Sequence, residues 1–345
     1  MASQSKNANL SAAKAAKQDE FYTQLADIER EMKHYRKHFK GKTVFLNCDD
    51  PRESNFFHYF SYNFETLGLK KLIAACYKSQ ERDLFSTGAA EQAIYLVYEG
   101  DKNGSGVPDP EEIGVQQFQG DGDFRSAESI ALLKEADIVV TNPPFSLFRE
   151  YVGQLMDYDK KFIIVGPTGA VTYKELFPLF RDNKMWLGYG FQAGNAYFKT
   201  PHTTDYAKGV YDDTTGLVKF RNVSWFSNLD IAKRHEELIL WKNYDPALYP
   251  SYDNYDAIEV TRIKDIPADW DGAMGVPITF MDSYNPDQFE ILGITDRDNN
   301  SGLKTKEYAR AEVPNAGDLN RRGALLVNGK LKSTFARLLI RKKQS

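Results

Sequence analysis

The sequence Asn142-Pro143-Pro144-Phe145 could do chemistry, because it places two hydrogen-bond acceptors beside an aromatic ring directly after a hydrophobic run at 137–141. The acceptors are the Asn142 side-chain carbonyl and the Pro143 backbone carbonyl, and the fixed φ of proline makes the turn that holds them stiff. Two such acceptors can hold both N–H bonds of a base's exocyclic amino group and favour the tetrahedral geometry in which its nitrogen attacks. Phe145 offers a face on which a base taken out of a duplex can stack. The competing interpretation is a proline turn with Phe145 buried in the core.

This arrangement indicates methyl transfer to an amino nitrogen from a cationic sulfonium donor. Such a donor makes the amine acidic as transfer proceeds, so no general base with a tuned pKa is required. The donor of this kind that proteins use is S-adenosylmethionine, and Asn142 lies where it could contact the donor as well as the base.

A second signal is Asp123-Phe124, which follows a predicted strand at 115–119. An aspartate after a strand can accept a hydrogen bond from the amino group of the cofactor's adenine, and the neighbouring phenylalanine can cover the adenine ring. The same residues could instead form an ordinary aspartate–glycine turn, which is common.

Two weaker signals lie nearer the N-terminus. Asn47 begins a polar turn after the first predicted strand, and the carboxylates of Asp49 and Asp50 in that turn can bind the ammonium group of a methionine moiety. No glycine-rich loop follows it. Tyr22 and Thr23 could reach the carboxylate of the same moiety. We therefore count all five among the candidate cofactor-binding residues.

Metal catalysis is not expected. The chain has two cysteines, Cys48 and Cys76, and five histidines without metal-ligand spacing. Two isolated thiols form neither a tetrahedral metal site nor a disulfide framework, which favours a reducing cytoplasm.

Strands and helices alternate from about 43 to 188, which predicts an α/β fold with a mostly parallel sheet and helices on both faces. We expect strands at 43–47, 71–77, 93–98, 115–119, 137–141, 162–165 and 185–188, and helices at 19–39, 54–67, 129–136, 145–156 and 173–182. Ligands bind beyond the carboxyl ends of strands in such sheets. The polar clusters at 47–51, 120–124 and 142–145 each follow a strand, so they should converge on one crevice.

The rhythm changes after about residue 190. We expect a polar tail at 1–18, a catalytic domain at 19–240 with a further strand at 223–228, and a smaller recognition region at 241–345 with β-like pieces at 277–281 and 335–341. The tract 190–221 could contribute to recognition. No run of about 18 apolar residues occurs, so no membrane span is expected.

The charge is uneven, which bears on binding to phosphates. The net charge is −4, yet residues 301–345 hold 11 Lys and Arg against 3 Asp and Glu, a local excess of +8. A local basic face matters more than the total for binding a phosphate backbone. Candidate phosphate contacts are Arg321, Arg322, Lys330 and Lys332. The alternative is a solubilising, solvated tail.

Several runs closely resemble the EcoRI-type adenine-specific DNA methyltransferases. They are Phe21-Tyr22-Thr23-Gln24, Asn47-Cys48-Asp49-Asp50-Pro51-Arg52, Gly120 to Ser126, Asp137 to Tyr151, Trp225 to Asp230, Tyr252 to Ile258 and Met274 to Phe280. The resemblance covers about 19–292, and it implies a class I (Rossmann-like) methyltransferase fold of the gamma group, S-adenosylmethionine as donor and adenine in duplex DNA as acceptor. Asn142, Pro143, Pro144 and Phe145 match its catalytic motif.

The resemblance also implies roles for other residues. Asp123 and Phe124 match the site of the cofactor's adenine, and Tyr22, Thr23, Asp49 and Asp50 match less specific cofactor positions. One departure is the strand end Ala75-Cys76-Tyr77-Lys78. It lacks the acidic residue with which many methyltransferases hold the ribose, so that contact is unassigned.

The resemblance further implies a monomer that acts on double-stranded DNA in the cytoplasm of a bacterium, or as a phage-encoded protein. It implies a cognate restriction endonuclease that the chain need not touch, and a short palindromic target. Two other functions stay open on the sequence. The same motif serves methylation of amino groups in RNA or protein, and a methyltransferase-like fold can bind nucleic acid without turnover.

Overall fold

The computed structural model describes residues 21–47, 54–76, 93–106, 108–109, 112–200, 206, 209–296 and 298–344. The tail expected at 1–18 and the candidates Asp49 and Asp50 lie outside these residues. The chain forms two compact units, of which the first comprises residues up to Thr168 and Gly188–Asp230, and the second Gly169–Leu187 and Ile231–Ser345. Residues 169–187 and 231–240, which we expected in the catalytic domain, thus belong with the C-terminal residues.

The first unit is built on a mixed sheet. The strands that this unit contributes lie in the order β5 (Gly114–Gln117), β4 (Ile94–Tyr98), β3 (Lys71–Ala75), β2 (Thr43–Asn47), β6 (Ile138–Thr141), β7 (Lys161–Pro167) and β12 (Val223–Ser227). The central strands β3, β2, β6 and β7 pair in parallel. β4, β5 and β12 pair antiparallel, so the expected parallel sheet is confirmed at the centre and wrong toward the edges.

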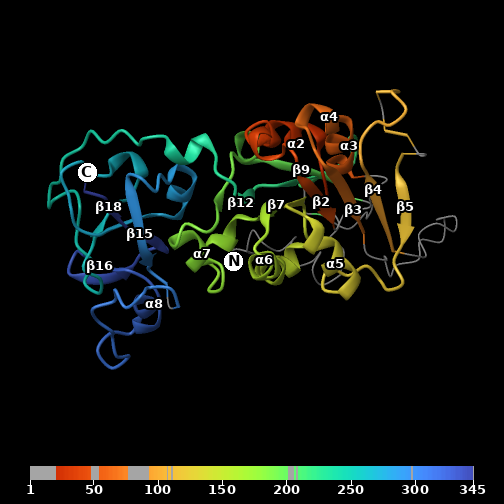
Figure 1. The fold of residues 1–345 in the computed structure, drawn as a ribbon. Coiled ribbons are helices and arrows are strands. Elements are labelled where there is room, and N and C mark those ends of the chain that lie inside the picture. Colours follow the sequence, from red (N-terminus) through yellow and green to blue (C-terminus); the bar gives the residue numbers. More distant parts are fainter. Residues whose placement is uncertain are drawn as a thin grey trace. The chain divides into compact units, whose positions relative to one another are not determined.

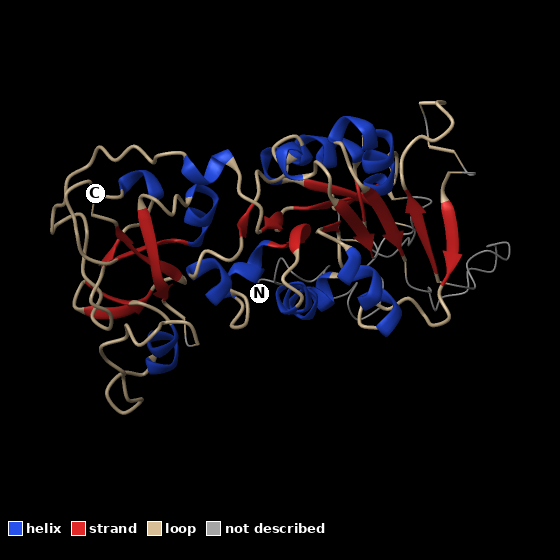
Figure 2. Ribbon diagram, viewed as in Figure 1, coloured by secondary structure: helices blue, strands red, loops and turns tan. Residues whose placement is uncertain are grey.

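Helices cover both faces of this sheet (Figures 1 and 2). On one face lie α2 (Leu25–Met32), α3 (Asn55–Tyr62) and α4 (Phe64–Leu67), and on the other α5 (Ala127–Glu135) and α6 (Phe148–Asp157). Every residue of β2 and β6 is buried. That is the pattern of parallel strands covered on both faces, and it explains why these strands read as continuous hydrophobic runs.

Two of the expected helices are interrupted in the structure, and the helix expected at 173–182 is shortened to Phe177–Arg181. The helix expected at 19–39 begins only at Leu25, because Tyr22–Thr23 forms a short strand, β1, that pairs with Lys199 and Phe198. The helix expected at 54–67 is divided at Asn63, whose side chain donates to the Tyr59 carbonyl (2.8 Å) and whose backbone leaves the helical region. Local periodicity does not reveal either interruption.

β1 belongs to a second, antiparallel sheet of the first unit. Its order is β1, β9 (Ala196–Lys199), β11 (Leu217–Phe220) and β10 (Tyr211–Asp212). The tract 190–221 therefore joins the N-terminal segment by backbone pairing. This sheet has no signature in the sequence, since its strands span two to four residues.

The second unit contains α7 (Phe177–Arg181), β8 (Trp186–Leu187), α8 (Ala316–Arg321) and an antiparallel hairpin of β16 (Ala324–Val327) and β17 (Lys330–Ser333). Its four-stranded sheet has the order β13 (Ile258–Glu259), β14 (Met274–Pro277), β18 (Arg337–Lys342) and β15 (Phe289–Ile294). Within this sheet the buried Glu259 accepts hydrogen bonds from Arg337, the shortest at 2.6 Å.

The β-like piece expected at 277–281 is wrong in its position. β14 ends at Pro277 because its partner β18 begins at Arg337, the residue opposite, and a 3-10 turn follows at Ile278–Ser283. In the described part of the chain no helix is long and apolar enough to cross a membrane.

Packing of α6 on the sheet gives a first prediction. A Cβ atom at Gly166, in β7, would lie 2.2 Å from Cε2 of the fully buried Phe148 ring. We expect Gly166→Ala to lower the free energy of unfolding by about 1–3 kcal/mol through overpacking. Thermal or urea denaturation measures this.

The matched control is Gly153→Ala on α6, where the added methyl meets nothing within 4 Å. This change should leave stability equal or raise it by up to about 1 kcal/mol, since alanine favours a helix. Equal stability of the two variants would contradict the tight packing of β7 on α6.

Candidate active site

The end of β2 meets the end of β6 at the point where the strand order reverses direction. The chain runs from β2 outward to β3, and later returns to the other side of β2 with β6. Asn47 and Asn142 thus emerge at the same edge, which in open α/β sheets is where ligands bind. Thr141 Oγ1 donates to the Asn47 carbonyl across this point.

Asn142 is buried, and its two amide atoms have different surroundings. Its side-chain nitrogen donates to the backbone carbonyl of Phe21, while Oδ1 is buried with no hydrogen-bond partner among the described residues. The bond to Phe21 fixes which way the amide points. A buried acceptor without a partner costs free energy. Asn142 therefore holds an oriented acceptor ready for an N–H group.

The segment before α2 is held in place from several directions. The Phe21 ring packs against Phe145, Phe198 and Phe220, with its centroid 4.9 Å from that of Phe220. The Thr23 carbonyl accepts a hydrogen bond from the Asn55 side chain at 2.8 Å. This packing makes the Phe21 carbonyl a fixed partner for Asn142.

Thr23 itself resembles Asn142 in one respect. It is 1% exposed, and its hydroxyl oxygen Oγ1 has no hydrogen-bond partner among the described residues. β1 thus carries a second buried polar atom that a ligand could satisfy. Tyr22, the other candidate in this strand, is half-buried.

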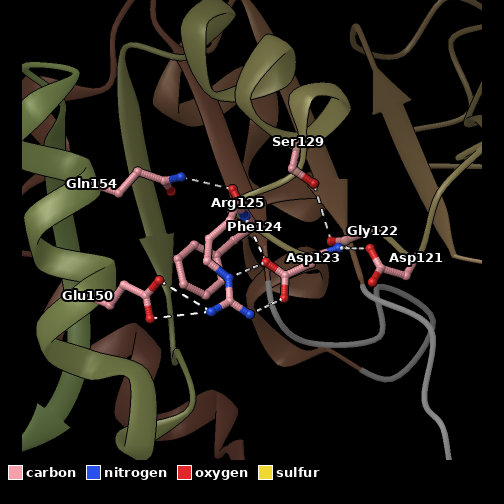
Figure 3. A network of polar contacts seen from close by, with 8 residues as sticks. All are labelled: Asp121, Gly122, Asp123, Phe124, Arg125, Ser129, Glu150 and Gln154. Carbon is pink, nitrogen blue, oxygen red and sulfur yellow. Dashed lines mark hydrogen bonds and ion pairs between the residues drawn. The ribbon is translucent and has the colours of Figure 1, made fainter.

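Asp123 lies in a network of polar contacts that Figure 3 shows. Its carboxylate accepts from Arg125 through Nε at 2.8 Å and a terminal nitrogen at 2.6 Å, and Arg125 also contacts Glu150 at 3.2 Å. The hydrogen bond from Arg125 holds the pKa of Asp123 below its usual range, against the effect of partial burial. The carboxylate is therefore ionised at neutral pH.

β5 delivers this loop to the same edge of the sheet. β4 runs antiparallel to β3 and β5 antiparallel to β4, so β5 runs in the direction of β3. The carboxyl end of β5 consequently lies at the edge from which Asn47 and Asn142 emerge. We expected a parallel strand to carry the Asp123 loop to this edge. Instead the chain reverses direction twice, first into β4 and then into β5, with the same result.

Helix α6 joins the three polar clusters. Its Tyr151 hydroxyl donates to Asn47 Oδ1, and its ring packs edge-on against Phe124 with centroids 5.2 Å apart. Gln154 donates to the Phe124 carbonyl at 3.0 Å (Figure 3). These contacts bring the described residues of the three clusters together at one edge of the sheet, and the helix that follows the Asn-Pro-Pro-Phe sequence holds them there.

Tyr151 and Gln154 hold the residues of this edge in place, and the interpretation of the sequence missed both of them. Tyr151 lies within a run that carries the family resemblance. It is on the amphipathic helix α6, at a position whose side chain faces the core. A polar atom on a residue expected to face the core could have drawn attention to it. Gln154 gives no comparable signal.

The prolines and Phe145 have clear structural roles. Pro143 is buried, and the Pro144 carbonyl accepts from the Leu147 amide at 2.9 Å, which starts the 3-10 turn Phe145–Leu147. Phe145 is 7% exposed and lies 6.4 Å from Phe21, centroid to centroid. Its packing agrees with the alternative interpretation of a core residue, and a role in stacking remains a prediction.

The candidate phosphate contacts lie in the second unit. Arg321, at the end of α8, and Lys330 and Lys332, in β17, are exposed. Arg322 is half-buried and forms an ion pair with Asp296. Its charge is therefore balanced within the chain, and it is a weaker candidate than the other three.

Among the residues that the structure describes, no group of three or more His, Cys, Asp or Glu side chains could hold a metal ion.

Comparison with known proteins shows the family to which this chain belongs. The model of the family described as adenine-specific methyltransferase EcoRI matches residues 9–343. The type II methyltransferase M.EcoRI of Escherichia coli is 49% identical over 307 residues, which cover 86% of this chain and 94% of the relative. The type II methyltransferase M.MpnI of Mycoplasma pneumoniae is 36% identical over 96% of this chain and 98% of its own length.

A third relative, the type II methyltransferase M.MgeORF184P of Mycoplasma genitalium, is 38% identical over 96% of this chain and 98% of its own length. No solved structure matches the chain significantly. The family match covers nearly the whole chain, including the polar edge of the sheet and the second unit. This chain therefore belongs to the EcoRI family of adenine-specific methyltransferases.

Proposed function

We propose that this chain transfers a methyl group from S-adenosylmethionine to the N6 atom of an adenine flipped out of duplex DNA, on a class I methyltransferase sheet. The observation that carries the proposal is the buried, unpartnered Oδ1 of Asn142 at the strand-order reversal. An acceptor fixed there is what an adenine amino group needs. The family to which the chain belongs supports the same reaction.

The residues at this edge fit the cofactor. Its adenine amino group would bind Asp123, with Phe124 beside the ring, and its methionine moiety would lie toward Tyr22 and Thr23, where the buried Thr23 hydroxyl lacks a partner. Asp49 and Asp50 follow β2 in the sequence and supply carboxylates for an ammonium group. When bound, the cofactor supplies an electrophilic methyl group on a cationic sulfur.

Arg125 has a bearing on this assignment. It forms hydrogen bonds with both carboxylate oxygens of Asp123 and lies 5.1 Å from the centroid of the Phe124 ring. The carboxylate oxygens have further lone pairs, so Asp123 can accept from an adenine amino group and from Arg125 together. Arg125 would then orient Asp123.

The chain's own residues position the attacking nitrogen. The Asn142 Oδ1 and the Pro143 carbonyl accept the two N–H bonds of the target adenine, which draws the nitrogen lone pair out of conjugation with the ring. The bound cofactor would supply its methyl group to this lone pair and leave as the neutral thioether, and the methylated nitrogen would give up one proton to solvent. Preorganised acceptors of this kind act without rearranging during the reaction.

We place DNA target recognition mainly in the second unit and the tract 190–221. A flipped base requires contacts to the flanking duplex, and phosphate contacts from cations supply most of the sequence-independent affinity. The exposed cations Arg321, Lys330 and Lys332 form no ion pair with a described residue. A monomer suffices for a palindromic target, because one subunit can methylate each strand in a separate visit.

The double variant Lys330→Ala/Lys332→Ala tests this placement. We expect it to weaken binding to all DNA sequences alike and to lower the slope of log K against log salt by about 2, one unit for each lost phosphate contact. Fluorescence anisotropy over a range of salt concentrations measures both. The control Lys33→Ala/Lys37→Ala removes the same charge from exposed residues that follow α2, in the first unit. An equal effect of both pairs would contradict a phosphate-binding role for β17.

A direct test of the reaction uses a labelled methyl donor with unmethylated DNA, RNA or bulk protein as acceptor. We expect label in DNA alone, at adenine N6, and mapping of the modified adenines gives the target sequence. Label in RNA or protein would favour the alternative function, methylation of amino groups in RNA or in protein. DNA binding without label in any acceptor would show a silent binding module, against which the intact Asn142 site argues.

A further inference from the structure

The connection between β4 and β5 carries side-chain oxygens at the spacing of a calcium-binding loop. Counted from Asp101 as position 1, the oxygen-bearing residues at positions 1, 3, 5, 9 and 12 are Asp101, Asn103, Ser105, Asp109 and Glu112. Twelve-residue calcium loops place ligands at these positions, a glycine at position 6 and a glutamate at position 12. Gly106 is at position 6, with a φ of +75° that favours glycine.

Glu112 provides a second observation that points to a ligand. Its Oε1 accepts from the backbone amides of Lys102 at 2.6 Å and Asn103 at 3.1 Å, so the carboxylate lies over the start of the loop. Its Oε2 is buried and has no hydrogen-bond partner among the described residues. Burying a carboxylate oxygen without a partner is costly, and a cation is the partner that a glutamate at position 12 has in such loops.

Residues 104–106 of the loop are wound around its first residue. The Asp101 carboxylate accepts from the amides of Gly104 and Gly106, both at 2.7 Å, and Asn103 Oδ1 accepts from the Ser105 amide at 2.8 Å. The acidic side chains alone form no group of three that could hold a metal in the described residues. The neutral amide and hydroxyl oxygens of the loop must therefore supply the other ligands of a bound ion, and calcium accepts such ligands.

We propose that this loop binds one Ca²⁺ ion through Asp101, Asn103, Ser105 and Glu112. Asp109 accepts from the Asn103 side chain and from the Glu112 amide, so it holds the two ends of the loop together instead of binding the ion directly. Two carboxylate ligands are fewer than tight calcium loops carry, so the expected dissociation constant is about 10⁻⁵–10⁻³ M. Mg²⁺ binds more weakly, since it demands a near-ideal octahedron that a loop of this kind does not provide.

The position of the loop separates this ion from methyl transfer. Tyr98, the last residue of β4, lies opposite Leu72 near the start of β3, so the loop leaves the sheet at the amino ends of the parallel strands. Asn142 emerges at their carboxyl ends. The ion orders the β4–β5 connection and takes no part in the reaction.

Isothermal titration calorimetry of the full chain with CaCl₂, after removal of metals with a chelator, tests the proposal. We expect a stoichiometry of one and, for Glu112→Gln, a dissociation constant at least about tenfold higher. The matched control is Glu99→Gln, an exposed residue just outside the loop that loses the same charge. Circular dichroism without calcium checks that the variants fold alike.

The absence of binding to the unaltered chain would overturn the proposal, as would equal affinities of Glu112→Gln and Glu99→Gln. Methyl transfer to DNA, assayed with and without chelator, should be unchanged in rate. Loss of methyl transfer on chelation, or in folded Glu112→Gln, would overturn the placement of the ion away from the reaction. Because calorimetry does not depend on turnover, the proposal can fail without the methyl-transfer function failing.

Discussion

Replacement of Asn142 by alanine should reduce the rate of methyl transfer by about 10²- to 10³-fold, equivalent to about 3–4 kcal/mol. The alanine removes the buried Oδ1, the acceptor that has no partner in the protein. It also leaves the Phe21 carbonyl without its donor. Single-turnover rates with labelled donor and DNA measure the loss. Affinity for S-adenosylhomocysteine should change little, because the role assigned to Oδ1 is in holding the target base.

The matched control for this prediction is Asn228→Ala. Asn228 is likewise an asparagine at the central sheet, but both ends of its amide are bonded: it accepts from the Phe162 amide at 2.8 Å and donates to the Lys160 carbonyl at 2.9 Å. These bonds lie at the start of β7, at the edge opposite to Asn142. Asn228→Ala should lower stability and keep the rate of methyl transfer. Full activity of Asn142→Ala would exclude the acceptor role.

Replacement of Asp123 by alanine should weaken binding of S-adenosylhomocysteine by about tenfold or more, since it removes a hydrogen bond to a charged group. Calorimetric titration measures the dissociation constant. Arg125 keeps the pKa of Asp123 low. The carboxylate therefore stays ionised as the pH falls through the neutral range, and its contribution to binding should be lost only when the pH falls through that lowered pKa.

Glu150→Ala separates the two roles that Asp123 could have. Glu150 shares Arg125 with Asp123 across an exposed ion pair, but lies on α6 and has no assigned contact with the cofactor. Removal of an exposed pair should change the dissociation constant by no more than about fivefold. Equal effects of Asp123→Ala and Glu150→Ala would show that Asp123 acts only by holding Arg125 and forming the turn.

The sequence by itself determined the central strands and the turn that carries Asn142. The strand predicted at 43–47 has those bounds in the structure, and the strand before Asn142 differs by one residue. Both are continuous apolar runs covered on both faces, so burial alone defines them. The polar residues that end them could be placed at one edge, because parallel strands end together.

Only the tertiary structure decided how the site is oriented. The amide of Asn142 is turned by the carbonyl of Phe21, which lies 121 positions away in the sequence. Phe21 is itself fixed by a sheet of short strands that joins Tyr22–Thr23 to residues 198–199. No local pattern encodes a partner at that separation, and strands of two residues have too few side chains to show a period.

The same reason explains the remaining differences. β4 is apolar enough to be predicted as a strand, and β5 was expected because it leads into the Asp123 turn, but the direction of both depends on the connections between them. The basic excess after residue 301 is visible in the sequence, whereas the pairing of Arg322 with Asp296 is not, because it depends on a contact between two loops. Residue types and periodicity thus determined the elements and the chemistry, while long-range contacts determined strand direction, side-chain orientation and which charges stay free.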